Sequence, residues 1–204
     1  MDYLAFFELL EKQVHSDVSI QKWIENIISF CSSDNPHDDW NQLASLDYQE
    51  TEELDIGIRE LFKNDPPADT TAGLWFGIFN PVDDNDQTVA DFYVSGSDRF
   101  DPDPEDNSWA VGPTWWPENR YANSAILSEI YRIAYAEDGL ENDAEYPLCL
   151  AYTCLVVRDL LNQNSDQVCA CSKQQMGVAV GFDSGDFLLL GKLTHQGIAK
   201  IDGP

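Results

Sequence analysis

The segment AEYPLCLAYTCLVVRDLLNQ, residues 144–163, constrains the fold more than any other part of the chain. Its apolar residues fall on almost every side of a helix, so a helix here must be buried over most of its surface. The longest nearly apolar piece, Cys149 to Val157, is too short to cross a bilayer. We therefore expect this to be the most buried helix of a globular protein, with Pro147 in its first turn, where a missing N–H is tolerated.

Apolar residues at helical spacing predict further helices. Steps of three and four residues between positions 4 and 31 indicate one or two helices, and another is expected within residues 49–63. The Pro-Pro pair at 66–67 marks its end, because proline cannot continue a helix. The isoleucine spacing predicts one more helix over residues 117–139, with the Pro-Glu pair at its start in the first turn.

Short segments rich in aromatic and β-branched residues predict strands. GLWFGIF at 73–79 and TVADFYVSG at 88–96 are expected to form a hairpin with a long acidic loop, and SWAVG at 108–112 is a candidate third strand. The segment 177–193 alternates apolar residues, turns at Asp183-Ser-Gly185 and returns, which indicates an antiparallel hairpin.

These elements together predict an α+β fold: an antiparallel sheet with two packed central helices and additional N-terminal helices. A chain of 204 residues is long enough for one well-buried core and short for two ordinary domains. We expect a single domain over residues 1–204. The alternative division makes residues 1–65 a helical subdomain and residues 70–204 the mixed part.

Acidic residues dominate the charge of the chain. Asp and Glu number 37 against 11 Lys and Arg, which gives a formal net charge of −26 at pH 7. Such a surface repels nucleic acid and anionic membranes, and it accelerates encounter with a basic partner by long-range attraction. We therefore expect neither direct nucleic-acid binding nor membrane binding. The alternative explanation of the acidity is solubility alone.

The N-terminus and the cysteines bear on where the protein resides. MDYLAFFELLEKQ has acids among its apolar residues and no preceding basic stretch, so we expect neither a signal peptide nor a membrane span. Five cysteines, an odd number, argue against a disulfide framework and for a reducing compartment. Cys149 and Cys154 lie in the apolar helix and are expected to act as small hydrophobic residues. These features predict a cytoplasmic protein.

Residue spacing gives little support for a metal or a cofactor. Asp101 and Asp103 begin an alternation typical of a calcium loop, but its sixth and twelfth positions hold Asp106 and Gly112 instead of the required Gly and Glu. A looser divalent-ion site stays open beside the simpler reading of a solvated loop. The histidines are scattered and Cys169-Ala-Cys171 has no second cysteine pair, so zinc is not expected. We predict no metal and no cofactor.

Enzyme signatures are absent from the sequence. The chain has no Gly-x-Ser-x-Gly elbow, no Gly-x-x-x-x-Gly-Lys phosphate loop and no dinucleotide-binding glycine series. Carboxylate pairs at a spacing suited to hydrolysis arise by chance in so acidic a chain. We therefore expect no catalysis, and a carboxylate-dependent hydrolase with a cleft near Trp109 and Trp115 is the alternative.

The tryptophans are more informative. Trp75 and Trp109 lie in expected strands, where packing in the core explains them. Trp115 and Trp116 are adjacent in GPTWWP, so in an extended chain they point to opposite faces and one is expected to be exposed. An exposed aromatic ring beside acids is typical of a protein-binding hot spot.

Four stretches within residues 70–165 resemble a known class of proteins: GLWFGIFNPV, DFYVSGSDRFD, WAVGPTWWPENRYANSAIL and AEYPLCLAYTCLVVRDLL. Their general pattern is similar to that of the small single-domain immunity proteins of bacterial polymorphic-toxin and interbacterial-competition systems. The resemblance implies an acidic, cytosolic, non-catalytic protein that binds a cognate toxin domain and blocks its active site. A regulatory binding module without a toxin partner is the other alternative.

The acidic loops and the paired tryptophans form the predicted contact surface. Toxins that attack nucleic acid carry basic clefts, which dense carboxylates can occupy, while aromatic rings supply buried contact. The predicted partner-binding residues are Asp83, Asp84, Asp86, Asp101, Asp103, Glu105, Asp106, Trp115 and Trp116. The alternative is that these loops are solvated and that binding occurs elsewhere.

Overall fold

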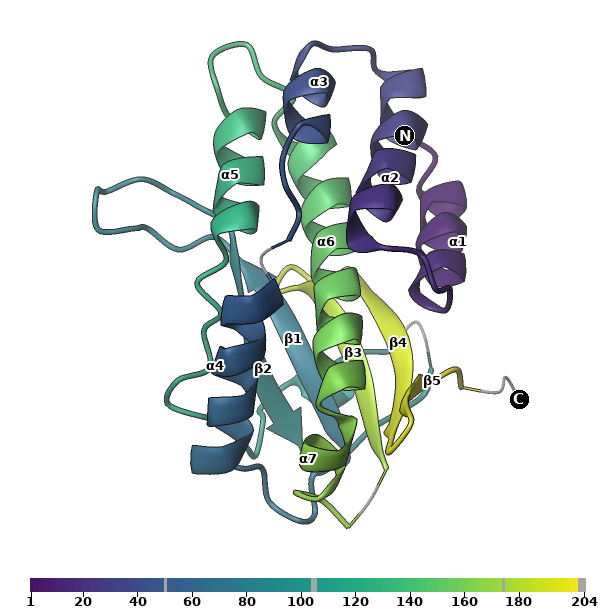
Figure 1. Cartoon of the computed structure of the whole chain (residues 1–204), viewed down its shortest axis with the longest axis vertical. Coiled ribbons are helices and arrows are strands. Elements are labelled where there is room, and N and C mark those ends of the chain that lie inside the picture. Colours follow the sequence, from purple (N-terminus) through teal and green to yellow (C-terminus); the bar gives the residue numbers. More distant parts are fainter. Residues whose placement is uncertain (50, 104–105, 174, 202–204) are drawn as a thin grey trace.

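The structure is a computed structural model that describes residues 1–49, 51–103, 106–173 and 175–201 (Figure 1). Its helices are α1 (Tyr3–Val14), α2 (Ile20–Asp34), α3 (Asp39–Ala44), α4 (Thr51–Asn64), α5 (Ala125–Ala134), α6 (Asn142–Gln163) and α7 (Ser165–Cys169), with a single 3-10 turn η1 (Ser108–Ala110). Its strands are β1 (Gly73–Phe79), β2 (Asp91–Ser97), β3 (Met176–Phe182), β4 (Phe187–Thr194) and β5 (Gly197–Ala199). The mixture of helices and one sheet confirms the α+β class.

Helix α6 lies at the centre of the described structure (Figure 1). Every residue from Leu148 to Val157 is 0% exposed, as its apolar composition predicts. Helices α1, α2, α4 and α5 pack around it, and β1, β3, β4 and β5 contact it from the sheet. The expected position of Pro147 was wrong: the helix begins at Asn142, earlier than the apolar run, so the proline lies in the second turn.

The N-terminal helices and the sheet contribute to one buried apolar cluster. Residues 4–31 form α1 and α2, and the helix expected within 49–63 is α4. One cluster of buried apolar side chains extends from Phe6 of α1 to Leu193 of β4. Within the described residues, the segment 1–65 therefore buries its apolar side chains together with those of the sheet.

The sheet is mixed, and the antiparallel prediction is corrected here. The strand order is β2-β1-β3-β4-β5; β1 pairs with β3 in parallel, whereas the other neighbouring pairs are antiparallel. Both predicted hairpins are present as β1–β2 and β3–β4. The chain between β2 and β3 passes through α5, α6 and α7, and so long a connection allows β3 to enter beside β1 in the same direction.

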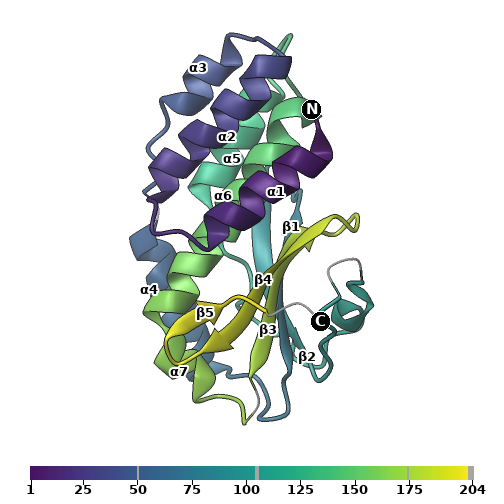
Figure 2. The ribbon, with the colours of Figure 1, turned by 90° about the vertical axis from the view of Figure 1, so that its right-hand side faces the viewer.

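The two faces of the sheet are covered differently (Figure 2). Leu74, Phe76 and Ile78 of β1 point into the helical layer. The opposite face is covered by the connection that follows β2, where Trp109 packs with Trp75 in a second buried cluster. The candidate strand at 108–112 is wrong: residues 108–110 form η1, with the Ala110 N–H donating to the Asn107 carbonyl.

Glycines make room for the aromatic rings on this second face. Gly73 pairs with Gly177, and Gly77 pairs with Gly181, across the parallel strands. A Cβ atom on Gly181 would lie 2.4 Å from the Phe187 Cβ and 2.7 Å from the Trp75 ring. Because two real carbon atoms cannot approach so closely, the rings occupy the space that a side chain would take.

The segment 114–122 protects the outer edge of β2. The Val94 N–H donates to the Arg120 carbonyl, and the Ala122 N–H donates to the Phe92 carbonyl. This pairing makes the predicted helix start at 117 wrong, because the backbone there follows the strand edge. Helix α5 begins later, at Ala125, where the Ser124 hydroxyl accepts from the Leu127 N–H.

We predict that Gly181→Ala lowers the free energy of unfolding by about 1–3 kcal/mol, because the new methyl group overpacks against the Phe187 Cβ and the Asp186 backbone. Urea denaturation measures the change. The matched control is Gly57→Ala in α4, where a Cβ meets no atom within 4 Å. The control should keep or raise the stability, because alanine is the better helix former. Equal stability of Gly181→Ala and the wild type would contradict this account.

Candidate functional site

Arg120 lies between two exposed aromatic rings. Its guanidinium carbon lies 4.4 Å from the centroid of the Trp116 ring and 4.5 Å from that of the Tyr121 ring. The guanidinium also donates to the Pro117 carbonyl at 3.0 Å and to the Tyr121 hydroxyl at 2.9 Å. These contacts hold two large side chains in fixed orientations at the surface.

Two further rings extend this group into one aromatic patch, defined by Phe79, Tyr93, Trp116, Arg120 and Tyr121. The Tyr93 ring lies 5.3 Å from Trp116, and Phe79 lies 5.4 Å from Tyr121 between ring centroids. Trp116 is 49% exposed and Tyr121 is 44% exposed. The patch therefore presents aromatic surface to solvent beside the edge of β2.

Tyr93 anchors the patch to the sheet. Its ring covers Gly77, and its hydroxyl donates to the Asp183 carboxylate at 2.9 Å. Burial, followed by the bond to Asp183, raises the pKa of the tyrosine hydroxyl well above its ordinary value. The hydroxyl therefore stays protonated and keeps donating at physiological pH.

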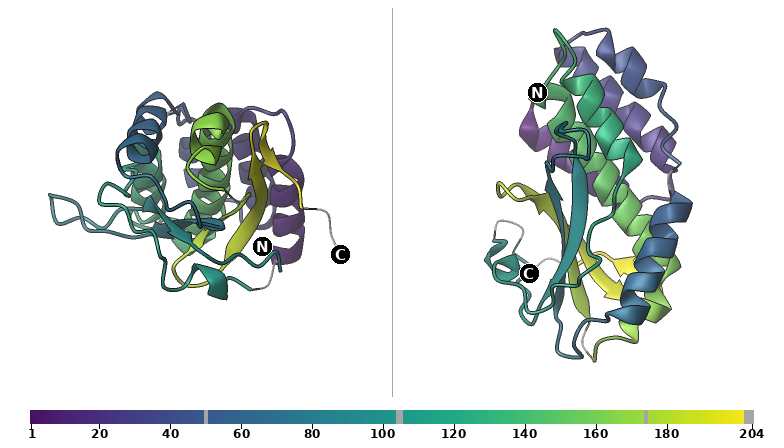
Figure 3. Two further views of the ribbon diagram at one scale, coloured as in Figure 1. Left: turned by 90° about the horizontal axis from the view of Figure 1, so that it is seen from below. Right: turned by 90° about the vertical axis from the view of Figure 1, so that its left-hand side faces the viewer.

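The acidic residues Asp83, Asp84 and Asp86 lie on the β1–β2 loop, which projects from the body (Figures 1 and 3). The Asp83 carboxylate accepts from the backbone N–H groups of Asn85 at 2.8 Å and Gln87 at 2.9 Å, so it shapes the loop. Asp84 and Asp86 are exposed. The root of the loop is close to the patch, because Phe79 ends β1.

The second acidic loop lies elsewhere. Asp101 and Asp103 line a groove formed with α1 and β4, on the side of the sheet away from β2. Asp106 accepts from the Ser108 N–H at 2.7 Å, and this bond lowers the pKa of its carboxyl. Glu105 falls outside the described residues. The structure therefore places the root of the first acidic loop at the aromatic patch, whereas Asp101 and Asp103 line a groove beside β4.

The paired tryptophans point in opposite directions, as their adjacency predicts. Trp115 is 6% exposed, its indole N–H donates to the Asp65 carbonyl at 3.0 Å, and its ring contacts Phe62. The prediction that Trp115 belongs to the contact surface is wrong, because its ring is buried. Trp109 and Trp115 pack in different clusters on opposite faces of the sheet.

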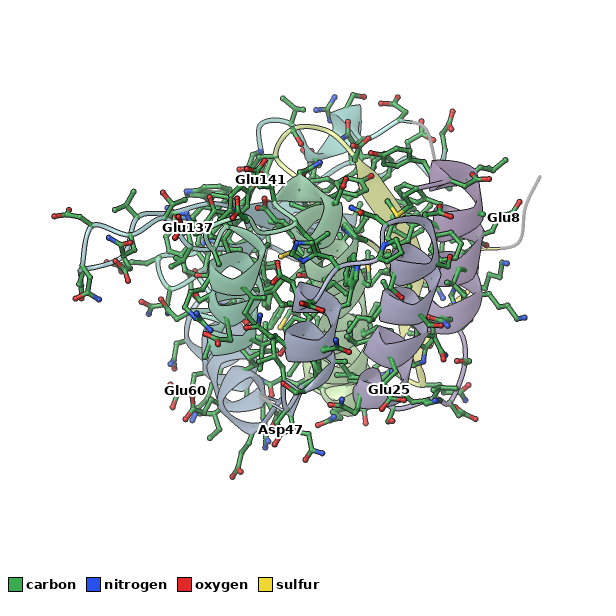
Figure 4. All side chains as sticks on the ribbon, turned by 90° about the horizontal axis from the view of Figure 1, so that it is seen from above. Glu8, Glu25, Asp47, Glu60, Glu137 and Glu141 are labelled. Atoms are coloured by element: carbon green, nitrogen blue, oxygen red, sulfur yellow. The ribbon has the colours of Figure 1, made fainter. Side chains whose placement is uncertain are left out.

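Acidic side chains surround the molecule rather than marking one site (Figure 4). The exposed acids labelled there lie on α1, α2, the α3–α4 connection, α4 and the α5–α6 connection: Glu8, Glu25, Asp47, Glu60, Glu137 and Glu141. A dispersed negative charge creates a long-range field but does not specify where a partner docks. The aromatic patch is the more specific feature.

Three further features concern metal ligands, cysteines and membrane spans. The described residues include no group of three or more His, Cys, Asp or Glu side chains able to hold a metal ion. Cys149 and Cys154 are fully buried and free, as expected of small hydrophobic residues, and burial raises the pKa of both thiols. None of the described helices is both long and apolar enough to span a membrane.

Sequence reasoning found Trp116 but missed Phe79, Tyr93, Arg120 and Tyr121. The spacing in WWPENRY was the available signal, because a bend after Pro117 brings Arg120 back to the Trp116 ring. The sequence pattern places Phe79 and Tyr93 in strands and gives no sign of the patch. Their contribution depends on the β1–β2 register, which pairs Gly77 with Tyr93.

We predict that the amide signals of Asn85 and Gln87 report the titration of Asp83. The two backbone hydrogen bonds lower the pKa of the Asp83 carboxyl below its ordinary value of 3.8. Because the folded-state pKa is lowered, the stabilisation is present above the ordinary pKa and is lost as the pH falls through the folded-state value. NMR titration should give a shared midpoint below 3.8, absent in Asp83→Asn. A midpoint at or above that value would refute the assignment.

Comparison with known proteins finds no matching family model, no similar curated protein and no similar solved structure. Function is therefore inferred from the arrangement of the described residues.

Proposed function

We propose that the protein is a cytoplasmic, non-catalytic immunity protein that binds and neutralises a cognate bacterial toxin domain. The partner is basic, and it docks on the aromatic patch and the acidic β1–β2 loop. The observation that carries the proposal is the exposed stack of Trp116, Arg120 and Tyr121, which is held in place before any partner arrives.

The composition of this stack favours protein binding. Trp, Tyr and Arg are the residues most enriched among binding hot spots. Binding normally costs entropy when side chains become ordered, but Arg120 already fixes both neighbouring rings. The patch therefore offers apolar contact area at a low ordering cost.

The charge of the chain favours a basic partner. With a net charge of −26, the protein attracts positively charged surfaces over distance and repels other acidic molecules. The β1–β2 loop begins after Phe79 of the patch, projects from the body and carries the exposed Asp84 and Asp86. Such a protrusion suits the basic cleft of a toxin that attacks nucleic acid, where it would exclude the negatively charged substrate.

The proposal is tested by isolating the partner and measuring protection. Tagged protein is used to capture binding proteins from the native lysate at moderate salt, and products of neighbouring genes are assayed directly. We expect one stoichiometric basic protein whose expression alone stops growth, and co-expression of this chain should restore growth. A captured partner that is harmless to cells would favour a regulatory module instead.

We predict that Asp84→Asn with Asp86→Asn slows association with the toxin domain by about two- to fivefold at low salt. The loss should shrink as salt is raised, because exposed charges are screened. Stopped-flow kinetics measures the rate. The matched control is Asp101→Asn with Asp103→Asn, which removes the same charge from the groove beside α1 and β4. Equal slowing by both pairs would mean that the β1–β2 loop is not the docking element.

We predict that Trp116→Ala weakens binding by about 2 kcal/mol or more, through dissociation that is about 30-fold faster. The indole is half exposed, so its removal leaves the buried core intact. Surface plasmon resonance gives the dissociation rate, and the unfolding temperature checks the fold. Val111→Ala, at a neighbouring site that is 71% exposed, should have little effect. Unchanged dissociation in Trp116→Ala would remove the patch from the interface.

A further inference from the structure

A groove of about 260 Å³ lies between α4 and residues 119–123 along the edge of β2. The ribbon in Figure 3, right, shows α4 on this side of the sheet. Buried apolar side chains line it: Leu54, Ile58 and Leu61 of α4 with Phe92 and Val94 of β2. Arg120 and Tyr121 line it as well, so the groove is continuous with the aromatic patch.

The far end of α4 holds the two walls of the groove together. The Asp65 carbonyl accepts from the Trp115 indole N–H at 3.0 Å, and the Asp65 carboxylate accepts from the Glu118 N–H at 3.2 Å. These bonds connect the end of α4 to the segment on the opposite wall. The groove is therefore present before a ligand enters.

Gly57 leaves the α4 wall of this groove open. The residue lies in the interior of the helix, where glycine is destabilising relative to alanine. A Cβ at this position would meet no atom within 4 Å. No described neighbour is therefore so close that residue 57 has to lack a side chain. A glycine in such a place allows another molecule to approach the helix backbone closely.

The rim of the groove is acidic. Glu53, Glu60 and Asp65 line it, and the one cationic lining residue, Arg120, already stacks on Trp116 and Tyr121. A second copy of this acidic chain would bring further negative charge to the rim. Charge complementarity therefore favours a basic occupant with an apolar side chain for the groove.

We propose that this groove binds an apolar side chain carried by a basic segment of the partner protein, whose lysines or arginines pair with Glu53, Glu60 and Asp65. The inference rests on the proposed function and deepens it, because it identifies the chemistry of the docking segment. The groove and the aromatic patch then form one continuous interface along the β2 edge.

The test uses a fluorescent peptide of leucine and lysine at helical spacing, with binding measured by fluorescence anisotropy at about 0.15 M salt. Gly57→Leu fills the groove without changing any charge and should weaken binding at least about tenfold, the loss expected when a large apolar side chain no longer fits. Gly57→Ala should bind as the wild type does. Both variants should unfold at or above the wild-type temperature, because leucine and alanine are better helix formers than glycine.

Hydrogen exchange shows where on the protein the peptide binds. The bound peptide should protect amides in α4 and in residues 119–123 of the wild type, and this protection should disappear in Gly57→Leu. A peptide with serine in place of leucine keeps the same charge and should bind much more weakly. Equal binding of the serine peptide, or wild-type affinity in Gly57→Leu, would overturn the groove proposal.

The experiments distinguish failure of the groove proposal from failure of the proposed function. If the toxin domain binds the wild type and Gly57→Leu equally while Trp116→Ala weakens it, only the groove proposal is wrong. If no toxin domain binds the wild type, the proposed function is wrong whatever the peptide does.

Discussion

The structure depends on the burial of α6. A helix with apolar side chains on all sides has no face for solvent, so the chain must supply a layer on each side. The sheet covers one side, and α1, α2, α4 and α5 cover the rest. This requirement places α4 beside the sheet, where its outer surface meets the segment along β2. The candidate interface is therefore a consequence of how the core is enclosed.

The second face of the sheet is covered by aromatic side chains from a connecting segment. In the described structure the connection after β2, with its 3-10 turn η1, covers this face, and its large rings pack on strands that carry glycine. Tyr93 on Gly77 belongs to the same arrangement, yet its neighbours Trp116 and Tyr121 remain exposed. The aromatic patch is thus an exposed extension of the packing that covers this face.

Local patterns predicted much of this structure. The composition of α6, the spacing in α1, α2 and α4, and the turn at Asp183–Gly185 each depend on neighbouring residues, which a sequence displays. The parallel pairing of β1 with β3 depends on residues far apart, and apolar spacing does not reveal it. The backbone near Pro117 was misread for a related reason: a first-turn signal there is overridden by hydrogen bonds to β2. Adjacency predicted that one of Trp115 and Trp116 is exposed, but only the fold shows that it is Trp116. Tyr93 required the strand register.

Charge and aromatic contact have separate roles in the proposed interface. Exposed carboxylates occur on many elements, so the field attracts a basic partner toward the molecule as a whole and gives little orientation. Short-range contacts must then select one edge of the sheet. Trp116 and Tyr121 supply exposed rings there, and Gly57 removes the side chain that would close the adjacent groove. Because these features lie along the protected edge of β2, a partner would contact ordered side chains instead of unpaired strand backbone. Specificity would then come from the shape of the patch and groove, and the acidity would chiefly set the rate of encounter.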